Sequence, residues 1–182
     1  MNNVLRKLLK VIIGLIIVLL IGIIFYVYYP KTNSPVAKDG ILDLTSWDFY
    51  TNGEISLKGE WEIYWGQLLT PEDFEETAKN KPNLTGYIKV PSKWKIDSND
   101  DVFPRKGFAT YRLVAKINPV KDIFGIKTKN IRMANKIYVN ESLIGQSGNP
   151  SSDSINYEPG NTPYTSFFNL EEIGRASCRE RV

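Results

Sequence analysis

Apolar positions are distributed along the chain in two different ways. Residues 11–29 form one continuous apolar run without a charged residue. A helix that crosses a bilayer needs about 20 predominantly apolar residues, so this run predicts a transmembrane helix in contact with membrane lipid. Beyond residue 40, apolar and polar positions alternate over short stretches, which is typical of strands with one buried face.

The residues before the apolar run predict its orientation. Arg6, Lys7 and Lys10 precede it, and positive residues favour the cytoplasmic side of a membrane. We therefore expect residues 1–10 to be a cytoplasmic basic flank in a protein of the plasma membrane, with the main domain extracellular. The alternative is a cleaved signal peptide, which has an apolar region of about 7–15 residues and a small-residue cleavage site. The longer run, without an A-x-A pattern, favours an uncleaved signal anchor.

The clearest strand pattern lies within residues 57–65. Trp61, Ile63 and Trp65 alternate there with polar positions, and a buried aromatic side chain removes roughly 150–250 Å² from solvent. This stretch is therefore predicted to be the packing centre of the domain. Residues 108–117 show the second clear alternation and are predicted to be its partner strand.

Shorter stretches complete the predicted fold. Asn52-Gly53 is a strong hairpin signal and predicts antiparallel pairing. Thr70 followed by Pro71 predicts the start of a short helix over residues 71–79. Many short strands and one helix predict an all-β sandwich or jelly roll. The further strands are expected at residues 41–44, 54–57, 87–90, 122–128, 131–139, 143–145 and 165–170.

The composition divides the chain into five parts. After the basic flank and the membrane anchor, residues 30–39 are rich in Pro, Ser and Asn and read as a linker. Residues 40–171 are expected to be an incomplete extracellular jelly-roll domain. Residues 172–182 show neither strand alternation nor a helical stripe, and they resemble the translation of a sequencing adapter. We expect this tail to be an artefact; the alternative is a genuine basic tail.

The charge balance gives no support for nucleic-acid binding. The whole chain has a formal net charge of +3, but the basic excess lies in the flank before the anchor and in the tail. The exported part is close to neutral, so the electrostatic footprint of a nucleic-acid-binding protein is missing.

The residue types restrict the chemistry further. The chain has no histidine, and its single cysteine, Cys178, lies in the tail, which removes the usual general base and thiolate chemistry. Glu60 and Glu62 fall on the polar face of the strand that carries Trp61, so we expect a solvated edge rather than an acid/base pair. Residues 97–101 are acidic but lack the complete ligand set of a calcium loop. We expect no catalysis, no cofactor and no metal.

Ligand binding is more consistent with the loops at the strand ends, because exposed aromatic side chains beside polar groups suit a sugar ring. The candidate ligand-binding residues are Trp94, Phe103, Arg105 and, from the long polar loop that starts at residue 149, Asn161. For Trp94 an alternative is a packing role over the Val90-Pro91 turn. The ligand itself, a carbohydrate or another small molecule, is not identified by these residues.

Several segments, in the order in which they occur, carry a family resemblance over residues 40–168. They resemble the extracellular jelly roll of the galactose-binding-domain-like superfamily, most closely the type found in bacterial seven-transmembrane receptors with diverse intracellular signalling modules. The segments are Leu42-Asp43-Leu44, Trp47-Asp48-Phe49, Leu57-Lys58-Gly59-Glu60-Trp61-Glu62-Ile63-Tyr64-Trp65, Gln67-Leu68-Leu69-Thr70-Pro71-Glu72-Asp73-Phe74, Val90-Pro91-Ser92-Lys93-Trp94, Gly107-Phe108-Ala109-Thr110-Tyr111-Arg112-Leu113, Ile137-Tyr138-Val139-Asn140 and Ser147-Gly148.

The resemblance implies an extracellular ligand-sensing domain of a membrane-bound signalling receptor, whose kinase or cyclase would lie in a missing C-terminal part. A related pattern occurs in the N-terminal sugar-binding domain of family 2 glycoside hydrolases. Two alternatives therefore stay open: a non-catalytic sugar-binding module of such a hydrolase, and a surface adhesion domain. The expected Gly after Asn140 is replaced by Glu141, which weakens the hairpin turn without forbidding it.

Overall fold

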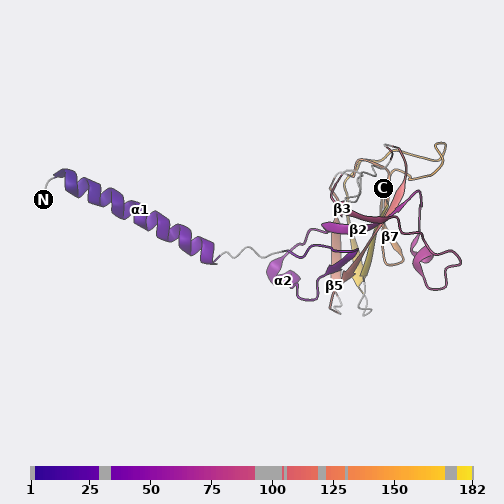
Figure 1. The fold of residues 1–182 in the computed structure, drawn as a ribbon, viewed down its shortest axis with the longest axis horizontal. Coiled ribbons are helices and arrows are strands. Elements are labelled where there is room, and N and C mark those ends of the chain that lie inside the picture. The colour runs from indigo at the N-terminus through magenta and orange to yellow at the C-terminus, as the bar shows by residue number, and fades with distance from the viewer. Residues whose placement is uncertain are drawn as a thin grey trace. The chain divides into compact units, whose positions relative to one another are not determined.

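The computed structural model of the chain describes residues 3–28, 34–92, 104, 106–118, 122–129, 131–170 and 176–181. It divides into two compact units, Met1–Asn33 and Ser34–Val182, and Figure 1 draws the first as a helix and the second as a body of strands.

The first unit is the single helix α1, Asn3–Tyr28. It begins before the predicted residue 11 and includes the basic flank, and no described residue of it is buried. At about 1.5 Å per residue, its 26 residues exceed the roughly 30 Å of a hydrocarbon core. By length and composition α1 can therefore cross a membrane, although a signal sequence passes the same test.

The second unit is an all-β, sandwich-like arrangement of two sheets, as the alternating pattern predicted (Figure 1). The large sheet has the order β3-β2-β4-β9-β6-β7, and β1 also pairs with β4. The small sheet contains β5 and β8. The strands of the large sheet are β1 (Ile41–Asp43), β2 (Gly59–Trp65), β3 (Gly86–Val90), β4 (Ala109–Lys116), β6 (Asn135–Val139), β7 (Ser142–Ser147) and β9 (Ala176–Arg181); those of the small sheet are β5 (Asp122–Lys127) and β8 (Thr165–Leu170).

Strand β2 lies at the centre of the packing, as expected. It pairs antiparallel with β3 on one side and with β4 on the other. Trp61 and Ile63 are buried, and Trp65 packs against the same cluster from a partly buried position. Full burial of a large apolar side chain contributes about 1.5–3 kcal/mol, so the β2–β4 pair supplies much of the core. The buried core cluster consists of Ala37, Leu42, Leu44, Trp61, Ile63, Ile88, Ala109, Tyr111 and Leu113.

The predicted hairpin at Asn52-Gly53 is wrong. Residues 54–57 are not a strand, and the short helix α2, Phe49–Asn52, occupies the preceding positions. Asp48 caps it by accepting a hydrogen bond from the backbone N–H of Tyr50. Gly53 ends the helix at a positive φ, so the dipeptide acts as a helix terminus here. The expected antiparallel pairing is confirmed for the other strand pairs of the large sheet, whereas β1 runs parallel to β4.

The helix predicted over residues 71–79 is much shorter than expected. Only a 3₁₀ turn, Pro71–Phe74, forms there. The start was predicted correctly, because Thr70 is the N-cap residue and Pro71 is the first residue of the turn. Glu75 already has extended backbone angles, so the segment leaves the helical conformation after one turn. The two-residue turn at Asn140-Glu141 is confirmed between β6 and β7, with Asn140 at φ +52°.

The tail contradicts the expectation that it lacks strand structure. Residues 176–181 form β9, which pairs antiparallel with β4 on one side and with β6 on the other. A ladder is made by backbone groups, so a segment without sequence alternation can still fill a position between two strands.

Candidate ligand-binding groove

A groove lies at the beginning of β2, where two other segments run beside it. The backbone N–H of Ala37 donates to the carbonyl of Lys58 at 2.9 Å, and the N–H of Glu60 donates to the carbonyl of Ala37 at 2.9 Å. On the other side of β2, Gly59 is paired with Val90 at the end of β3. The groove is therefore formed by the beginning of β2 and two neighbouring segments, each fixed to β2 by hydrogen bonds.

Gly59 is required at the centre of this arrangement. Its φ is +125°, a conformation that L side chains rarely adopt, and a Cβ there would overlap the backbone of Ala37. The close approach of the two segments thus depends on the absence of a side chain at Gly59. If this position carried a Cβ, the segment before β1 could not lie against β2.

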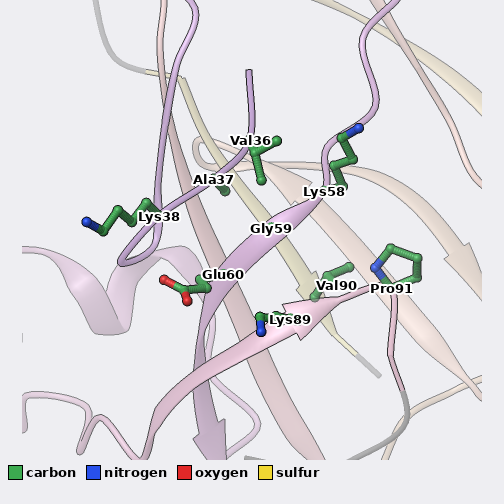
Figure 2. A pocket seen from close by; sticks show the side chains of 9 residues that line it. All are labelled: Val36, Ala37, Lys38, Lys58, Gly59, Glu60, Lys89, Val90 and Pro91. Carbon is green, nitrogen blue, oxygen red and sulfur yellow. The ribbon is translucent and has the colours of Figure 1, made fainter. Parts of the chain in front are cut away.

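The groove has a volume of about 540 Å³ and is open to solvent. Figure 2 shows Lys38, Lys58 and Lys89 on the three segments around Gly59. All three lysines are exposed. The lining residues are Val36, Ala37, Lys38, Lys58, Gly59, Glu60, Lys89, Val90 and Pro91. The site thus combines an apolar floor with three ammonium groups and one carboxylate.

The two carboxylates of β2 do not form the expected solvated edge, because β2 lies between β3 and β4. Glu60 accepts a hydrogen bond from the backbone N–H of Asp39 at 3.3 Å. Glu62 accepts from the Arg112 guanidinium and from the Tyr64 hydroxyl, each at 2.8 Å. Each carboxylate therefore already has partners within the fold.

Arg112 and Tyr64 form a small cluster with Phe74. The Arg112 guanidinium lies 5.1 Å from the centre of the Phe74 ring, and the Tyr64 ring meets the same ring edge-on at 5.1 Å. Burial, with a contribution from the Glu62 carboxylate, raises the pKa of Tyr64. The 3₁₀ turn thus covers the face of β2 that was expected to face solvent. The ion pair between Arg112 and Glu62 is partly buried as a result.

The sequence-predicted site residues do not coincide with this groove. Trp94, Phe103 and Arg105 lie outside the described residues. Asn161 is described, is exposed, and belongs to the loop between β7 and β8, whereas the groove is lined by residues 36–38, 58–60 and 89–91. The described part of the structure therefore brings none of the four candidates into the groove, although Pro91 leads into the segment that contains Trp94.

Sequence reasoning missed the lysines of the groove. They are separated by 20 and 31 positions in the chain, and only the pairing of three segments brings them together. The available signal was Gly59 itself, which follows Lys58 at the start of the strongest strand. Among the described residues, no group of three or more His, Cys, Asp or Glu side chains could hold a metal ion.

No protein-family model matches the sequence, and no curated protein matches it. Solved structures that resemble the fold include a β-glucuronidase of Faecalibacterium prausnitzii (17% identity, 70% of this chain, TM-score 0.48), a β-glucuronidase of Ruminococcus gnavus (16%, 70%, 0.43) and a family 2 β-galacturonidase of Eisenbergiella tayi (11%, 67%, 0.39). The chain spans about a fifth of the length of these enzymes. These similarities are too low to assign a function to this chain.

Proposed function

We propose that the chain is the membrane-anchored, extracellular ligand-binding domain of a bacterial signalling receptor, with the β-unit as a galactose-binding-like jelly roll. Its ligand would be a small molecule, with carbohydrate as the favoured class. In this proposal the chain is a sensor rather than an enzyme, and it acts by binding. The signalling output would belong to another part of the receptor.

The observation that carries the proposal is helix α1 before a β-domain. The most apolar 18-residue window of the helix has a mean hydropathy of 3.2. Arg6, Lys7 and Lys10 at its beginning favour a cytoplasmic N-terminus. The β-domain that follows would then be exported, and the linker would hold it near the membrane surface.

The β-domain supports a binding role through its groove. The groove volume of about 540 Å³ lies within the range of about 300–1,000 Å³ that is usual for small-molecule sites. The two carboxylates next to it, on β2, are held by hydrogen bonds to Asp39, Tyr64 and Arg112. Of these two carboxylates, Glu60 lines the groove and is held there by its hydrogen bond from the Asp39 N–H.

Membrane extraction tests the anchor. The full chain should stay in the membrane pellet after washing with alkaline carbonate, and mass spectrometry should recover peptides from residues 1–10 in the mature protein. Release into the supernatant, or a mature protein that begins after residue 29, would reject the anchored form.

A thermal-shift screen of the full chain against neutral monosaccharides and oligosaccharides tests the ligand class, with a rise in the unfolding midpoint as the expected result.

A further inference from the structure

The groove carries an excess of positive charge. Lys38, Lys58 and Lys89 belong to its lining, and Glu60 is the one acidic residue among the described residues that line it. Glu60 lies directly opposite Lys89 in the register of β2 and β3, and opposite charges in such a pair attract each other. Even if the charge of Glu60 balances the charge of Lys89, the two ammonium groups of Lys38 and Lys58 remain.

The position of Glu60 is restrained. Its carboxylate accepts a hydrogen bond from the backbone N–H of Asp39 at 3.3 Å, and this hydrogen bond lies on the side of β2 that faces residues 36–40. The negative charge of Glu60 is therefore held beside residues 36–40. Lys38 and Lys58 flank the same end of β2 and are exposed, so they can turn toward a ligand without breaking a buried contact.

The floor of the groove is apolar. Val36, Ala37, Val90 and Pro91 provide aliphatic surface between the lysines. A ligand that fits must therefore present an apolar face to the floor and a negative charge to the rim. A pyranose ring with one acidic substituent has both features, because its C–H groups form an apolar face and its substituent carries the charge.

We propose that the groove binds a monosaccharide that carries a carboxylate or a phosphate, with the charged substituent at either Lys38 or Lys58, which point to opposite sides of the groove (Figure 2). This inference rests on the proposed function, since it takes carbohydrate as the ligand class, and it adds the charge of the ligand. The attraction acts between groups near the surface, so it weakens with ionic strength.

Isothermal titration of the full chain in detergent micelles tests the inference. The probes are glucuronate, glucose 6-phosphate, glucose and inorganic phosphate. Glucuronate or glucose 6-phosphate should bind more tightly than glucose, and the Lys38→Gln, Lys58→Gln double variant should weaken that binding about fivefold to tenfold. The variant Lys127→Gln, which removes an exposed charge on β5, is the matched control and should bind like the parent protein.

The variant Glu60→Gln tests the sign of the effect. Glutamine retains an acceptor for the Asp39 N–H but removes the negative charge, so the affinity for the acidic sugar should rise about twofold to fivefold. A purely structural role for Glu60 predicts unchanged or weaker binding instead. Tryptophan fluorescence of each variant confirms that the fold is retained.

Three results would overturn the inference. Equal affinity for glucuronate and glucose, unchanged in the double lysine variant, would remove the role of charge and leave carbohydrate binding intact. Inorganic phosphate that binds as tightly as glucose 6-phosphate would show that no ring is recognised. If neither acidic sugar binds, the assignment of the groove is wrong, while carbonate extraction and the neutral-sugar screen decide the proposed function independently.

Discussion

The guanidinium of Arg112 lies 2.8 Å from the carboxylate of Glu62, and the two residues face each other directly in the register of β4 and β2. Their side chains are 25% and 15% exposed, so the pair is largely removed from water. Removal of only one partner of such a partly buried ion pair is costly, because the remaining charge stays partly buried without its partner.

Glu62→Gln should therefore destabilise the β-domain. The variant leaves Arg112 opposite a neutral amide, and we expect a loss of about 1–3 kcal/mol in the free energy of unfolding. Urea denaturation of the full chain in detergent, followed by tryptophan fluorescence, measures this loss. The control is Glu54→Gln, at an exposed position, which should change stability by less than about 0.5 kcal/mol. Equal midpoints for the two variants would contradict the role given to the ion pair.

Tyr64 should make the stability sensitive to alkaline pH. The ordinary pKa of a tyrosine is about 10, and burial, followed by the Glu62 carboxylate, raises the pKa of Tyr64 in the folded chain. Above pH 10 the unfolded chain releases this proton first, so the stabilising contribution is complete below pH 10 and is lost as the pH rises further. The Tyr64→Phe variant should lose less stability than the parent protein between about pH 10 and 11.5.

Urea midpoints measured at intervals from pH 8 to 11.5 check this difference. Tyr64→Phe also removes the hydrogen bond to Glu62, which lowers stability by about 0.5–1.5 kcal/mol at every pH below 10, so the informative quantity is the slope. Tyr157→Phe, at an exposed position, is the control and should follow the parent curve. Identical slopes for Tyr64→Phe and the parent protein would show that Tyr64 titrates normally.

Gly59→Ala should disrupt the groove more than an alanine at another glycine with positive φ. At Gly66, with φ +69°, an added Cβ meets no atom within 4 Å, so Gly66→Ala should cost about 1–2 kcal/mol. At Gly59 the same change also pushes away the backbone of Ala37, and we expect the cost to be larger by at least about 2 kcal/mol. Denaturation midpoints of the two variants compare these costs. Equal costs would mean that the Ala37 segment is not held against β2.

Removal of residues 172–182 should abolish cooperative unfolding of the β-domain. Strand β9 pairs with both β4 and β6, so its loss leaves two open strand edges that favour aggregation. Calorimetry and light scattering of the truncated chain measure both effects. Replacement of Ala176–Arg181 by six threonines is the control, because it retains a backbone ladder and strand propensity. A truncated chain with the parent's midpoint and sharpness would contradict this expectation.

The strongest local patterns predicted much of the fold. Trp61 and Ile63 on one face of β2 and Leu113 on β4 were read correctly as core positions, because their alternation is set by the two-residue period of a strand. The failures occurred where a local signal has two uses. Gly53 ends a helix instead of forming a hairpin, and Pro71 begins a single 3₁₀ turn instead of a longer helix.

The candidate site was much less predictable. Glu62 was expected in solvent because its strand face is polar in sequence, but Arg112 and the 3₁₀ turn cover it. The groove depends on the approach of Ala37 to Gly59, which are 22 positions apart. Such a contact leaves no periodic trace, so residue patterns pointed to loop aromatics such as Trp94 instead of the lysines around β2.

The proposed sensor requires that the β-domain lies outside the cell, and paired reporter fusions measure on which side of the membrane it lies. Alkaline phosphatase and green fluorescent protein are each fused after residue 39, behind helix α1, in a bacterial host. We expect active phosphatase and no fluorescence, because the residues after the helix are exported in the proposed orientation. A fluorescent fusion with inactive phosphatase would place the β-domain in the cytoplasm and contradict the proposed extracellular sensor.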